Sequence, residues 1–329
     1  MPAPTREALE PAAGAAPTGR WITTKRDRPM SLAMMLPLIR PVPTDPTDNG
    51  EQFWDLVAKA KLALDAGFDM IWFPDHFVLD LDPNADPRGP FEAWTALAGL
   101  AAALPGTPLG PMVACTGFHN PGSIAKMAET IDSISQGNFV LGLGCGWHKP
   151  EYDMFGYPFD HRVDRFEEAL HIISSLTRTG TASFEGQYSQ ARGALNIPRG
   201  PRWREGGPPI LLGAKGPRML RLTARYADAW NSDWLAKPED IQPMLAELDK
   251  ACTEVGRDPE TLVRTSSTRF TFNPDDQNPI AVKGTPAEMA AEMQAYAKLG
   301  MRQHLVSIDP RTTENIERFA EVIELFDRG

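Results

Sequence analysis

A histidine beside a carboxylate follows the second apolar run of the sequence. Asp75 and His76 stand just after residues 70–73 and Pro74. A histidine at the carboxyl end of a strand can act as a general base or donate a hydrogen bond to a bound ring. The alternative is that Asp75 caps a turn and His76 only packs, because adjacent residues on a strand point to opposite faces.

Two glycine-rich loops follow later apolar runs. Loop 142–147 differs from the dinucleotide-binding fingerprint because Trp147 takes the place of the third glycine, and Pro150 is expected to interrupt the helix that should follow. Its glycines are expected to admit a flat ring or a substrate, or else to form a tight turn. The second loop, Gly213-Ala214-Lys215-Gly216, leads into a helix opened by Pro217. Free backbone N–H groups at a helix start describe a phosphate site, with a plain turn as the alternative.

Metal and hydrolytic chemistry are not expected. Acidic and histidine side chains gather in one stretch of the sequence: His148, Glu151, Asp153, Asp160 and His161. A loop with such residues is more often solvated than ligating, and no His-Glu-x-x-His motif is present. The chain also lacks the Gly-x-Ser-x-Gly elbow of a serine hydrolase. We therefore predict no metal site.

The elements that must position these residues alternate between strand and helix from residue 31 onward. Apolar runs that indicate strands fall at 31–38, 70–73, 109–116, 139–143, 210–212, 228–231, 262–272 and 304–308. Helices are expected over 53–64, 90–103, 121–136 and 163–176, and from near Pro217, Pro238 and Pro286. Asp48 with Glu51, and Thr285 with Glu288, are spaced as capping boxes. About eight such units in roughly 300 residues favour a closed (β/α)8 barrel, an α/β fold of the TIM type, whose function lies at the carboxyl ends of the strands.

The chain is expected to form one barrel domain over residues 31–329, with an insertion at about 181–208. Residues 1–30 are rich in Ala, Pro, Thr and Arg and lack the apolar stretch of a secretory signal, so they are predicted to be a flexible tail that does not direct export.

Composition excludes several classes of protein. The 329 residues carry 33 basic and 43 acidic side chains, a net charge of −10, which disfavours nucleic acid and anionic membranes as partners. No apolar run is long enough to span a bilayer. Cys115, Cys145 and Cys252 are widely spaced and form no Cys-x-x-Cys pair, which disfavours a disulfide scaffold and a zinc knuckle. The expected protein is soluble and cytoplasmic.

Taken together and in order, the motifs resemble the luciferase-like monooxygenase superfamily. The resemblance rests on Trp72-Phe73-Pro74-Asp75-His76-Phe77, Phe118-His119-Asn120-Pro121, the stretch 132–138, loop 142–147 with His148-Lys149-Pro150-Glu151-Tyr152, and the stretch 213–231. The match runs from about residue 31 to 325.

This resemblance implies a barrel that binds coenzyme F420, slightly favoured, or reduced flavin mononucleotide (FMN). It implies that His76, with Asp75 beside it, is catalytic. The strand around 111–113 matches the place where the family often has a non-prolyl cis peptide behind the isoalloxazine ring. The implied cofactor-binding residues are Met112, Val113, Asn120, Gly144, Cys145, Gly146, Trp147, Gly213, Ala214, Lys215 and Gly216. The basic residues Lys215, Arg218, Arg221 and Arg225 gather at one helix start, which suits a phosphate-bearing cofactor.

The resemblance further implies an oxidoreductase acting on a small, hydrophobic organic substrate. With F420, hydride moves between ring and substrate while His76 handles the coupled proton; with reduced FMN, oxygen adds to the ring inside a closed pocket. Position 145 is a cysteine, where some FMN users have an arginine and some deazaflavin dehydrogenases a glutamate. Oxygen and a separate flavin reductase are the partners under the FMN reading, and a homodimer is expected. The alternative is a flavin-binding barrel without chemistry of its own.

Overall fold

The computed structural model describes residues 22, 24, 26–36, 40–41, 52–79 and 88–329. Most of the expected tail and the capping box expected at Asp48 and Glu51 lie outside the described residues. Helix α1 (Phe53–Ala66) begins where helical spacing predicts, and its start carries a capping box in which the Asp55 carboxylate accepts the Gln52 N–H at 2.6 Å.

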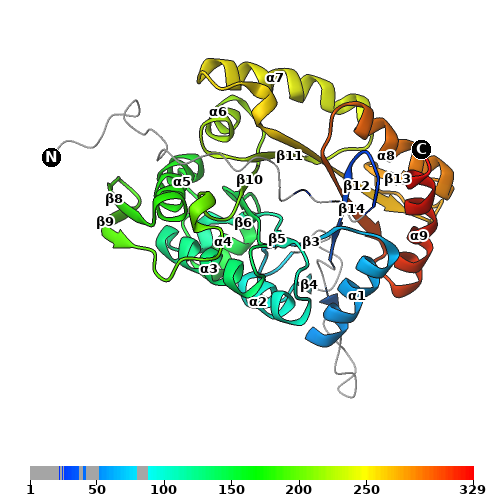
Figure 1. The fold of residues 1–329 in the computed structure, drawn as a ribbon, viewed down its shortest axis with the longest axis horizontal. Coiled ribbons are helices and arrows are strands. Elements are labelled where there is room, and N and C mark those ends of the chain that lie inside the picture. The colour runs from blue at the N-terminus through cyan, green and yellow to red at the C-terminus, as the bar shows by residue number, and fades with distance from the viewer. Residues whose placement is uncertain (1–21, 23, 25, 37–39, 42–51, 80–87) are drawn as a thin grey trace.

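A ten-stranded sheet forms the centre of the molecule, and helices surround it (Figure 1). The strands follow the order β5-β3-β1-β14-β12-β11-β10-β7-β6, with β13 paired to β12 outside this path. Their bounds are β1 (Ser31–Met35), β3 (Met70–Phe73), β5 (Leu109–Pro111), β6 (Ala114–Cys115), β7 (Leu141–Gly144), β10 (Ile210–Gly213), β11 (Ala229–Trp234), β12 (Val263–Thr271), β13 (Ala281–Lys283) and β14 (Gln303–Asp309). Neighbouring strands along the path are parallel, which confirms the predicted α/β barrel.

The third barrel position differs from its prediction as one strand over 109–116. The structure interrupts that strand at Met112 and Val113, whose peptide bond is cis. β5 pairs with β3 and β6 pairs with β7, while a bridge between Leu109 and Phe139 joins the two edges of the sheet. Counting β5 and β6 as one, the nine strands of the path give the eight positions of a (β/α)8 barrel.

Several of the helices that surround the barrel begin with the proline and capping residues predicted to start them. After α1 they are α2 (Ala93–Ala103), α3 (Pro121–Ile134), α4 (Lys149–Phe155), α5 (Arg162–Thr179), α6 (Pro217–Tyr226), α7 (Ile241–Glu254), α8 (Pro286–Lys298) and α9 (Thr313–Asp327). Proline opens α3, α6 and α8, because its fixed φ suits a first helical turn that needs no N–H donor. The predicted capping box of Thr285 and Glu288 at the start of α8 is confirmed.

One expectation about Pro150 is wrong. We expected this proline to interrupt the helix after loop 142–147, but α4 begins at Lys149 and contains Pro150 in its first turn. A first-turn N–H has no partner within a helix, so proline costs nothing there. The short helix α4 therefore continues directly from the glycine-rich loop and brings Glu151 and Tyr152 to the same end of the barrel.

The apolar core has two layers. Trp72, Leu211 and Leu305 belong to a buried cluster inside the barrel, and Ile22 of the N-terminal segment packs against it. A larger cluster fills the space between strands and helices; Leu97 and Ile173 are members. Burying side chains of this size stabilises the fold by roughly 1.5–3 kcal/mol each.

The barrel also includes residues just before the expected boundary at residue 31. The buried Arg28 side chain donates to Asp69 at 3.3 Å, forms an ion pair with Asp327 at 2.9 Å and donates to the Gly67 carbonyl at 3.0 Å. Asp69 directly precedes β3 and Asp327 ends α9. Arg28 therefore binds the segment just before β1 to the N-terminal face of the barrel.

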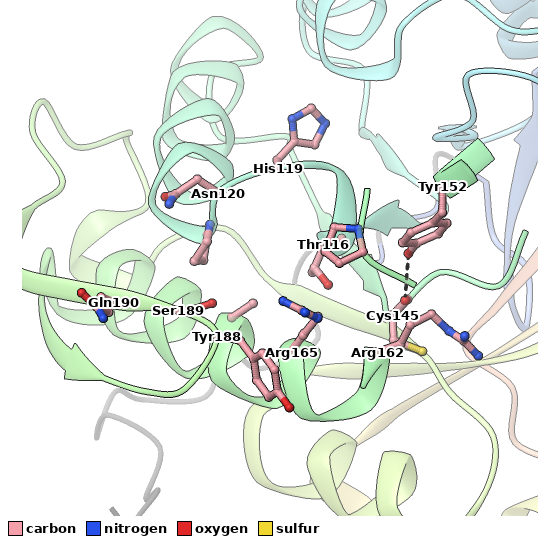
Figure 2. A pocket seen from close by; sticks show the side chains of 14 residues that line it. Thr116, His119, Asn120, Cys145, Tyr152, Arg162, Arg165, Tyr188, Ser189 and Gln190 are labelled. Atoms are coloured by element: carbon pink, nitrogen blue, oxygen red, sulfur yellow. Dashed lines mark hydrogen bonds between the residues drawn. The ribbon is translucent and has the colours of Figure 1, made fainter. Parts of the chain in front are cut away.

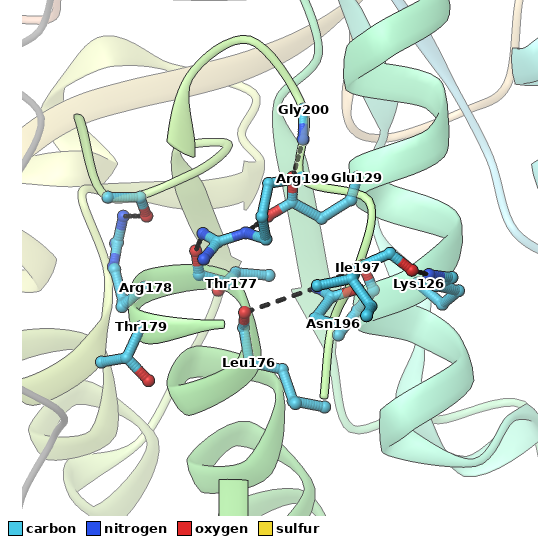
Figure 3. A network of polar contacts seen from close by, with 12 residues as sticks. Lys126, Glu129, Leu176, Thr177, Arg178, Thr179, Asn196, Ile197, Arg199 and Gly200 are labelled. Atoms are coloured by element: carbon cyan, nitrogen blue, oxygen red, sulfur yellow. Dashed lines mark hydrogen bonds and ion pairs between the residues drawn. The ribbon is translucent and has the colours of Figure 1, made fainter. Parts of the chain in front are cut away.

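The segment after α5 forms an antiparallel hairpin of β8 (Thr181–Glu185) and β9 (Gln190–Leu195), followed by an irregular stretch up to β10. Figure 3 shows how this stretch is fixed to α3 and α5. Glu129 of α3 binds Arg199 at 3.0 Å and the Gly200 N–H at 2.5 Å, and Arg199 donates to the Thr177 carbonyl at 2.5 Å. The insertion expected at about 181–208 stays a prediction.

Candidate functional site

His76 and Glu151 are in hydrogen-bond contact at the carboxyl end of the barrel. His76 follows β3, Glu151 lies on α4, and His76 Nδ1 is 2.8 Å from a Glu151 carboxylate oxygen. Glu151 also accepts the backbone N–H of Phe77 at 2.5 Å and of Val78 at 3.1 Å. Its side chain is 1% exposed, against 17% for His76. A buried carboxylate with these three donors holds the imidazole in one orientation and leaves Nε2 as the nitrogen available for proton transfer.

Asp75 forms its hydrogen bond with the backbone of the third barrel position. It is buried, and its carboxylate accepts the Cys115 N–H at 2.8 Å, which ties β3 to β6. Burial raises the pKa of Asp75 from 3.8 to about 7, against the lowering effects of the Cys115 hydrogen bond and nearby His76. The residue that binds His76 is Glu151, which sequence reasoning noted only as part of an acidic stretch.

We expect the Asp75→Asn variant to lose less stability than the wild type when the pH is raised. Because the pKa of Asp75 is higher in the folded protein than in the unfolded chain, the folded state keeps a proton that the unfolded state releases, so wild-type stability falls as pH rises from about 4 to about 7. Between pH 5 and pH 8 the difference in the free energy of unfolding between the variant and the wild type should change by about 2–3 kcal/mol in favour of the variant.

Urea unfolding at both pH values measures this difference. Asp65→Asn on α1, which changes an exposed aspartate paired with Lys61, is the matched control. An Asp75→Asn variant with the same pH dependence as the wild type would show that Asp75 is already ionised in the folded state at pH 5.

Cys115, Tyr152 and Gly146 pack against one another beside this pair. The Cys115 Sγ lies 2.9 Å from the Tyr152 hydroxyl, which also donates to the Cys145 carbonyl at 3.2 Å. A Cβ on Gly146 would lie 2.0 Å from the Tyr152 hydroxyl and 2.6 Å from Cys115 Sγ, and the backbone φ of Gly146 is +74°. Burial raises the pKa of Cys115 to about 12, so its thiol is not a nucleophile at neutral pH. Gly146 is thus required by the packing of Tyr152.

The side chain of Val113 explains two further glycines. A Cβ on Gly144 would lie 2.6 Å from the Val113 side chain, and one on Gly213 would lie 3.3 Å from it. The Met112–Val113 peptide is cis, which confirms the cis bond expected in this stretch. Val113 is therefore packed between the ends of β7 and β10, at the end of the barrel where His76 also lies.

The glycine turn after β10 carries one basic side chain. Lys215 is paired with Asp233 at 2.7 Å, and both side chains are about half exposed. At Gly216, with φ +78°, a Cβ would meet no atom within 4 Å, so the turn is open. Trp230 Nε1 donates to the Ala214 carbonyl at 3.0 Å and fixes the turn from inside. Open backbone at the start of the ten-residue helix α6 fits a phosphate group.

Two of the other basic residues expected at this helix start, Arg218 and Arg221, are paired with acids. Arg218 binds Asp164 at 2.8 Å and also pairs with Glu167 on α5. Arg221 lies 3.7 Å from Glu254 of α7. The charge of Arg218 is largely compensated by its two carboxylates, whereas the longer, half-exposed pair of Arg221 compensates only weakly.

A cavity of about 300 Å³ adjoins the site between α3, α5 and the β8–β9 hairpin (Figure 2). Thr116, Cys145 and Tyr152 line it on the side of the barrel. Asn120 lines it at the start of α3, where its Oδ1 accepts the Gly122 N–H at 2.9 Å as a helix cap. Arg162 and Arg165 line it from α5; sequence reasoning gave them no role.

The outer edge of the site is aromatic. Trp147 is 61% exposed, and its ring centroid lies 5.9 Å from that of His76. Phe77 packs against the exposed Phe155 at 4.6 Å. Aromatic side chains at the edge of a polar site suit an apolar ligand.

The structure thus brings His76, Asp75, Gly146, Trp147 and Cys145 to one end of the barrel through β3, β7 and α4. Met112 and Val113 lie at the same end, and the turn 213–216 follows the neighbouring strand β10. Asn120 lies farther out, at the cavity.

Along the described residues, we find no helix with the length and apolar character needed to cross a bilayer. The same part of the chain holds no group of three or more His, Cys, Asp or Glu side chains arranged for a metal ion.

A statistical model of the family described as luciferase-like monooxygenase matches residues 34–278. The phthiodiolone/phenolphthiodiolone dimycocerosates ketoreductase of Mycobacterium kansasii is 33% identical over 216 residues, which cover 60% of this chain and 58% of the relative. The 5,10-methylenetetrahydromethanopterin reductase of Archaeoglobus fulgidus is 29% identical over 206 residues, 63% of this chain and 57% of the relative. The chain spans little more than half the length of these two curated relatives.

Two solved structures share the fold. An F420-dependent secondary alcohol dehydrogenase, in complex with an F420–acetone adduct, superimposes with a TM-score of 0.74 at 17% identity, over 90% of this chain and 99% of that chain. The EDTA monooxygenase of Chelativorans sp. BNC1 superimposes with a TM-score of 0.71 at 15% identity, over 90% of this chain and 94% of that chain. At such identities the likeness shows the fold alone.

Proposed function

Since this chain belongs to the luciferase-like monooxygenase family, we propose that it is an oxidoreductase that transfers hydride between coenzyme F420 and the carbonyl carbon of a small hydrophobic ketone. The observation that carries the proposal is the His76–Glu151 pair, which provides an oriented proton donor at the mouth of the barrel. A ketoreductase among the similar proteins supports a carbonyl substrate.

The residues at the mouth of the barrel fit the cofactor. The open turn at Gly216 and the exposed Lys215 would hold its phosphate, and the backbone at Met112 and Val113 would lie behind its ring. When bound, the reduced cofactor supplies the hydride.

In this proposal His76 performs the proton transfer. Glu151 binds Nδ1–H and stabilises the imidazolium form, so that Nε2–H donates a proton to the carbonyl oxygen as the hydride reaches the carbon. The product is a secondary alcohol, and His76 is left neutral. Trp147 and Phe155 would contact the apolar part of the substrate.

Oxygen-dependent chemistry with reduced FMN is the second candidate. The family description and the fold shared with EDTA monooxygenase favour it. In that case a separate flavin reductase would supply the reduced flavin. A homodimer and a cytoplasmic location remain predictions from the sequence. None of the similar proteins named above supports the alternative of a barrel without chemistry.

Anaerobic titration of the purified protein with F420 and with reduced FMN tests the proposal. We expect tight binding of F420 and, with reduced F420, ketone-dependent oxidation of the cofactor in a panel of acetone, cyclohexanone and longer 2-alkanones. Oxygen-dependent consumption of FMN with an oxygenated product would establish the second candidate instead. Binding of neither cofactor would contradict both.

A further inference from the structure

The cavity between α3, α5 and the β8–β9 hairpin has an unusual charge for this protein. The whole chain has a net charge of −10. Among the described residues that line the cavity, Arg162 and Arg165 carry formal charge and no aspartate or glutamate is present. The first turn of the fourteen-residue helix α3 also faces it through Asn120 and Pro121. The cavity is therefore electropositive in an acidic protein.

Arg165 is held in place with part of its guanidinium free. Its Nε donates to the Asp160 carbonyl and its Nη2 to the Asp160 carboxylate, both at 3.0 Å. The guanidinium stacks on the Tyr188 ring at 4.4 Å, and in Figure 2 it lies between Tyr188 and Thr116. In the described part of the chain no acceptor binds Nη1. The partner Asp160 is largely exposed, so this ion pair compensates the charge only weakly.

Arg162 lacks a carboxylate partner among the described residues. Its Nη1 donates to the Phe159 carbonyl at 3.2 Å, and its guanidinium stacks on the Phe159 ring at 3.7 Å. Its Nε is fully buried and makes no hydrogen bond with the described residues. Its Nη2 has no acceptor among them either, so an anion in the cavity would accept a charge-assisted hydrogen bond from this guanidinium. Lys215 offers a contrast, since Asp233 already lies 2.7 Å from its ammonium group.

The uncharged wall of the cavity, formed by the hairpin tip, is also held in place by hydrogen bonds. Glu168 of α5 accepts the backbone N–H groups of Gln187, Tyr188 and Ser189 at 2.9, 2.7 and 2.8 Å. This carboxylate fixes the tip of the hairpin and places the Ser189 hydroxyl on the cavity wall. Because both arginines and the hairpin tip are anchored before any ligand arrives, binding an anion here requires little ordering of side chains.

We propose that this cavity binds an anionic group other than the phosphate assigned to the 213–216 turn, a carboxylate or a further phosphate, carried by the cofactor or the substrate while the reacting atoms lie at His76. The inference rests on the proposed function, since it assigns the ligand of that same site. Cys145 lines the cavity and belongs to the loop that also carries Trp147, whose ring centroid lies 5.9 Å from that of His76.

Arg162→Gln and Arg165→Gln test the proposal, with Arg192→Gln as the control. Arg192 lies on the same hairpin but is exposed and paired with Glu185. The first measurement is the Kd of F420 and of the same deazaflavin truncated at its ribityl chain, which lacks phosphate and carboxylates. If the cofactor carries the anion, each cavity variant weakens F420 by about tenfold or more and leaves the truncated form unchanged.

The second measurement separates a substrate anion from a cofactor anion. If the substrate carries it, the cavity variants leave F420 binding unchanged and raise the KM of levulinate, a ketone with a carboxylate, by about tenfold relative to neutral 2-pentanone. The control variant should match the wild type in both measurements.

A third measurement does not depend on cofactor or turnover. Millimolar pyrophosphate and citrate should raise the unfolding temperature of the wild type and of Arg192→Gln, but not of the two cavity variants. This result would support the cavity site even if the protein bound neither F420 nor FMN. Cavity variants that match the wild type with F420, levulinate, pyrophosphate and citrate would overturn the proposal.

Discussion

Replacing His76 with glutamine is expected to lower the turnover number by about 10²–10⁴-fold while changing the Kd of the cofactor by no more than about twofold. Glutamine can occupy the same space and donate a hydrogen bond, but it cannot deliver a proton. Steady-state kinetics with a ketone that the wild type reduces, together with cofactor titration, measure the two effects separately. Unchanged turnover would remove His76 from the chemical step.

Glu151→Gln separates orientation of the imidazole from proton donation by it. The amide can still accept the Phe77 and Val78 N–H groups, but its NH₂ would donate to His76 Nδ1 and so favour the tautomer with the proton on Nε2. The imidazolium then loses its counter-charge, and we expect turnover to fall by about 10²-fold with little change in cofactor affinity.

Asp153→Asn on the same short helix is the matched control for Glu151→Gln, because Asp153 is exposed and, among the described residues, pairs with Lys149 at the surface. We expect wild-type kinetics from it. If Asp153→Asn and Glu151→Gln reduced turnover equally, the effect would come from loosening α4 and not from the ion pair with His76.

The barrel could be predicted from the sequence because its signals are local. Apolar runs mark the strands, and Pro121, Pro217 and Pro286 mark helix starts that need no other part of the fold. Pro150 carries the same signal, yet it was interpreted as a helix breaker, although a proline in the first turn is compatible with a helix. The break at Met112 and Val113 left no local sign in an otherwise apolar stretch, so the resemblance to a family, and not the pattern, pointed to it.

A site residue could be predicted from the sequence only where its own type and its place at a strand end were enough to identify it. His76 stands out as a histidine at a strand end, but its partner lies 75 positions along the chain. No spacing rule connects the two, since contact depends on how α4 packs against the loop after β3. Asp75 is adjacent to His76 in the sequence, but adjacent side chains diverge, as the alternative interpretation stated, and Asp75 accepts the Cys115 N–H. The ion pairs of Lys215 and Arg218 are long-range for the same reason.

Truncating Asp228 to alanine is expected to lower the free energy of unfolding by about 3–5 kcal/mol, more than any surface change in this chain. Asp228 precedes β11, and its buried carboxylate binds Arg178 of α5 at 2.5 Å and the Ile210 N–H at 2.7 Å. The variant would leave the Arg178 guanidinium buried with only the Gly206 carbonyl as its partner. Urea unfolding measures the loss, and Glu185→Ala, which breaks the exposed pair with Arg192, should cost less than about 1 kcal/mol.

A second variant shows whether the loss of stability comes from the unpaired Arg178 guanidinium or from the missing Ile210 hydrogen bond. In Asp228→Ala/Arg178→Met the buried cation is absent, so stability should recover by about 2 kcal/mol or more over the single variant, because an apolar pair often replaces a buried ion pair at little cost. Recovery would show that the Arg178–Asp228 pair specifies how α5 packs against the start of β11 more than it stabilises the fold. A double variant as unstable as Asp228→Ala would instead assign the loss to the Ile210 hydrogen bond, which joins the starts of β10 and β11.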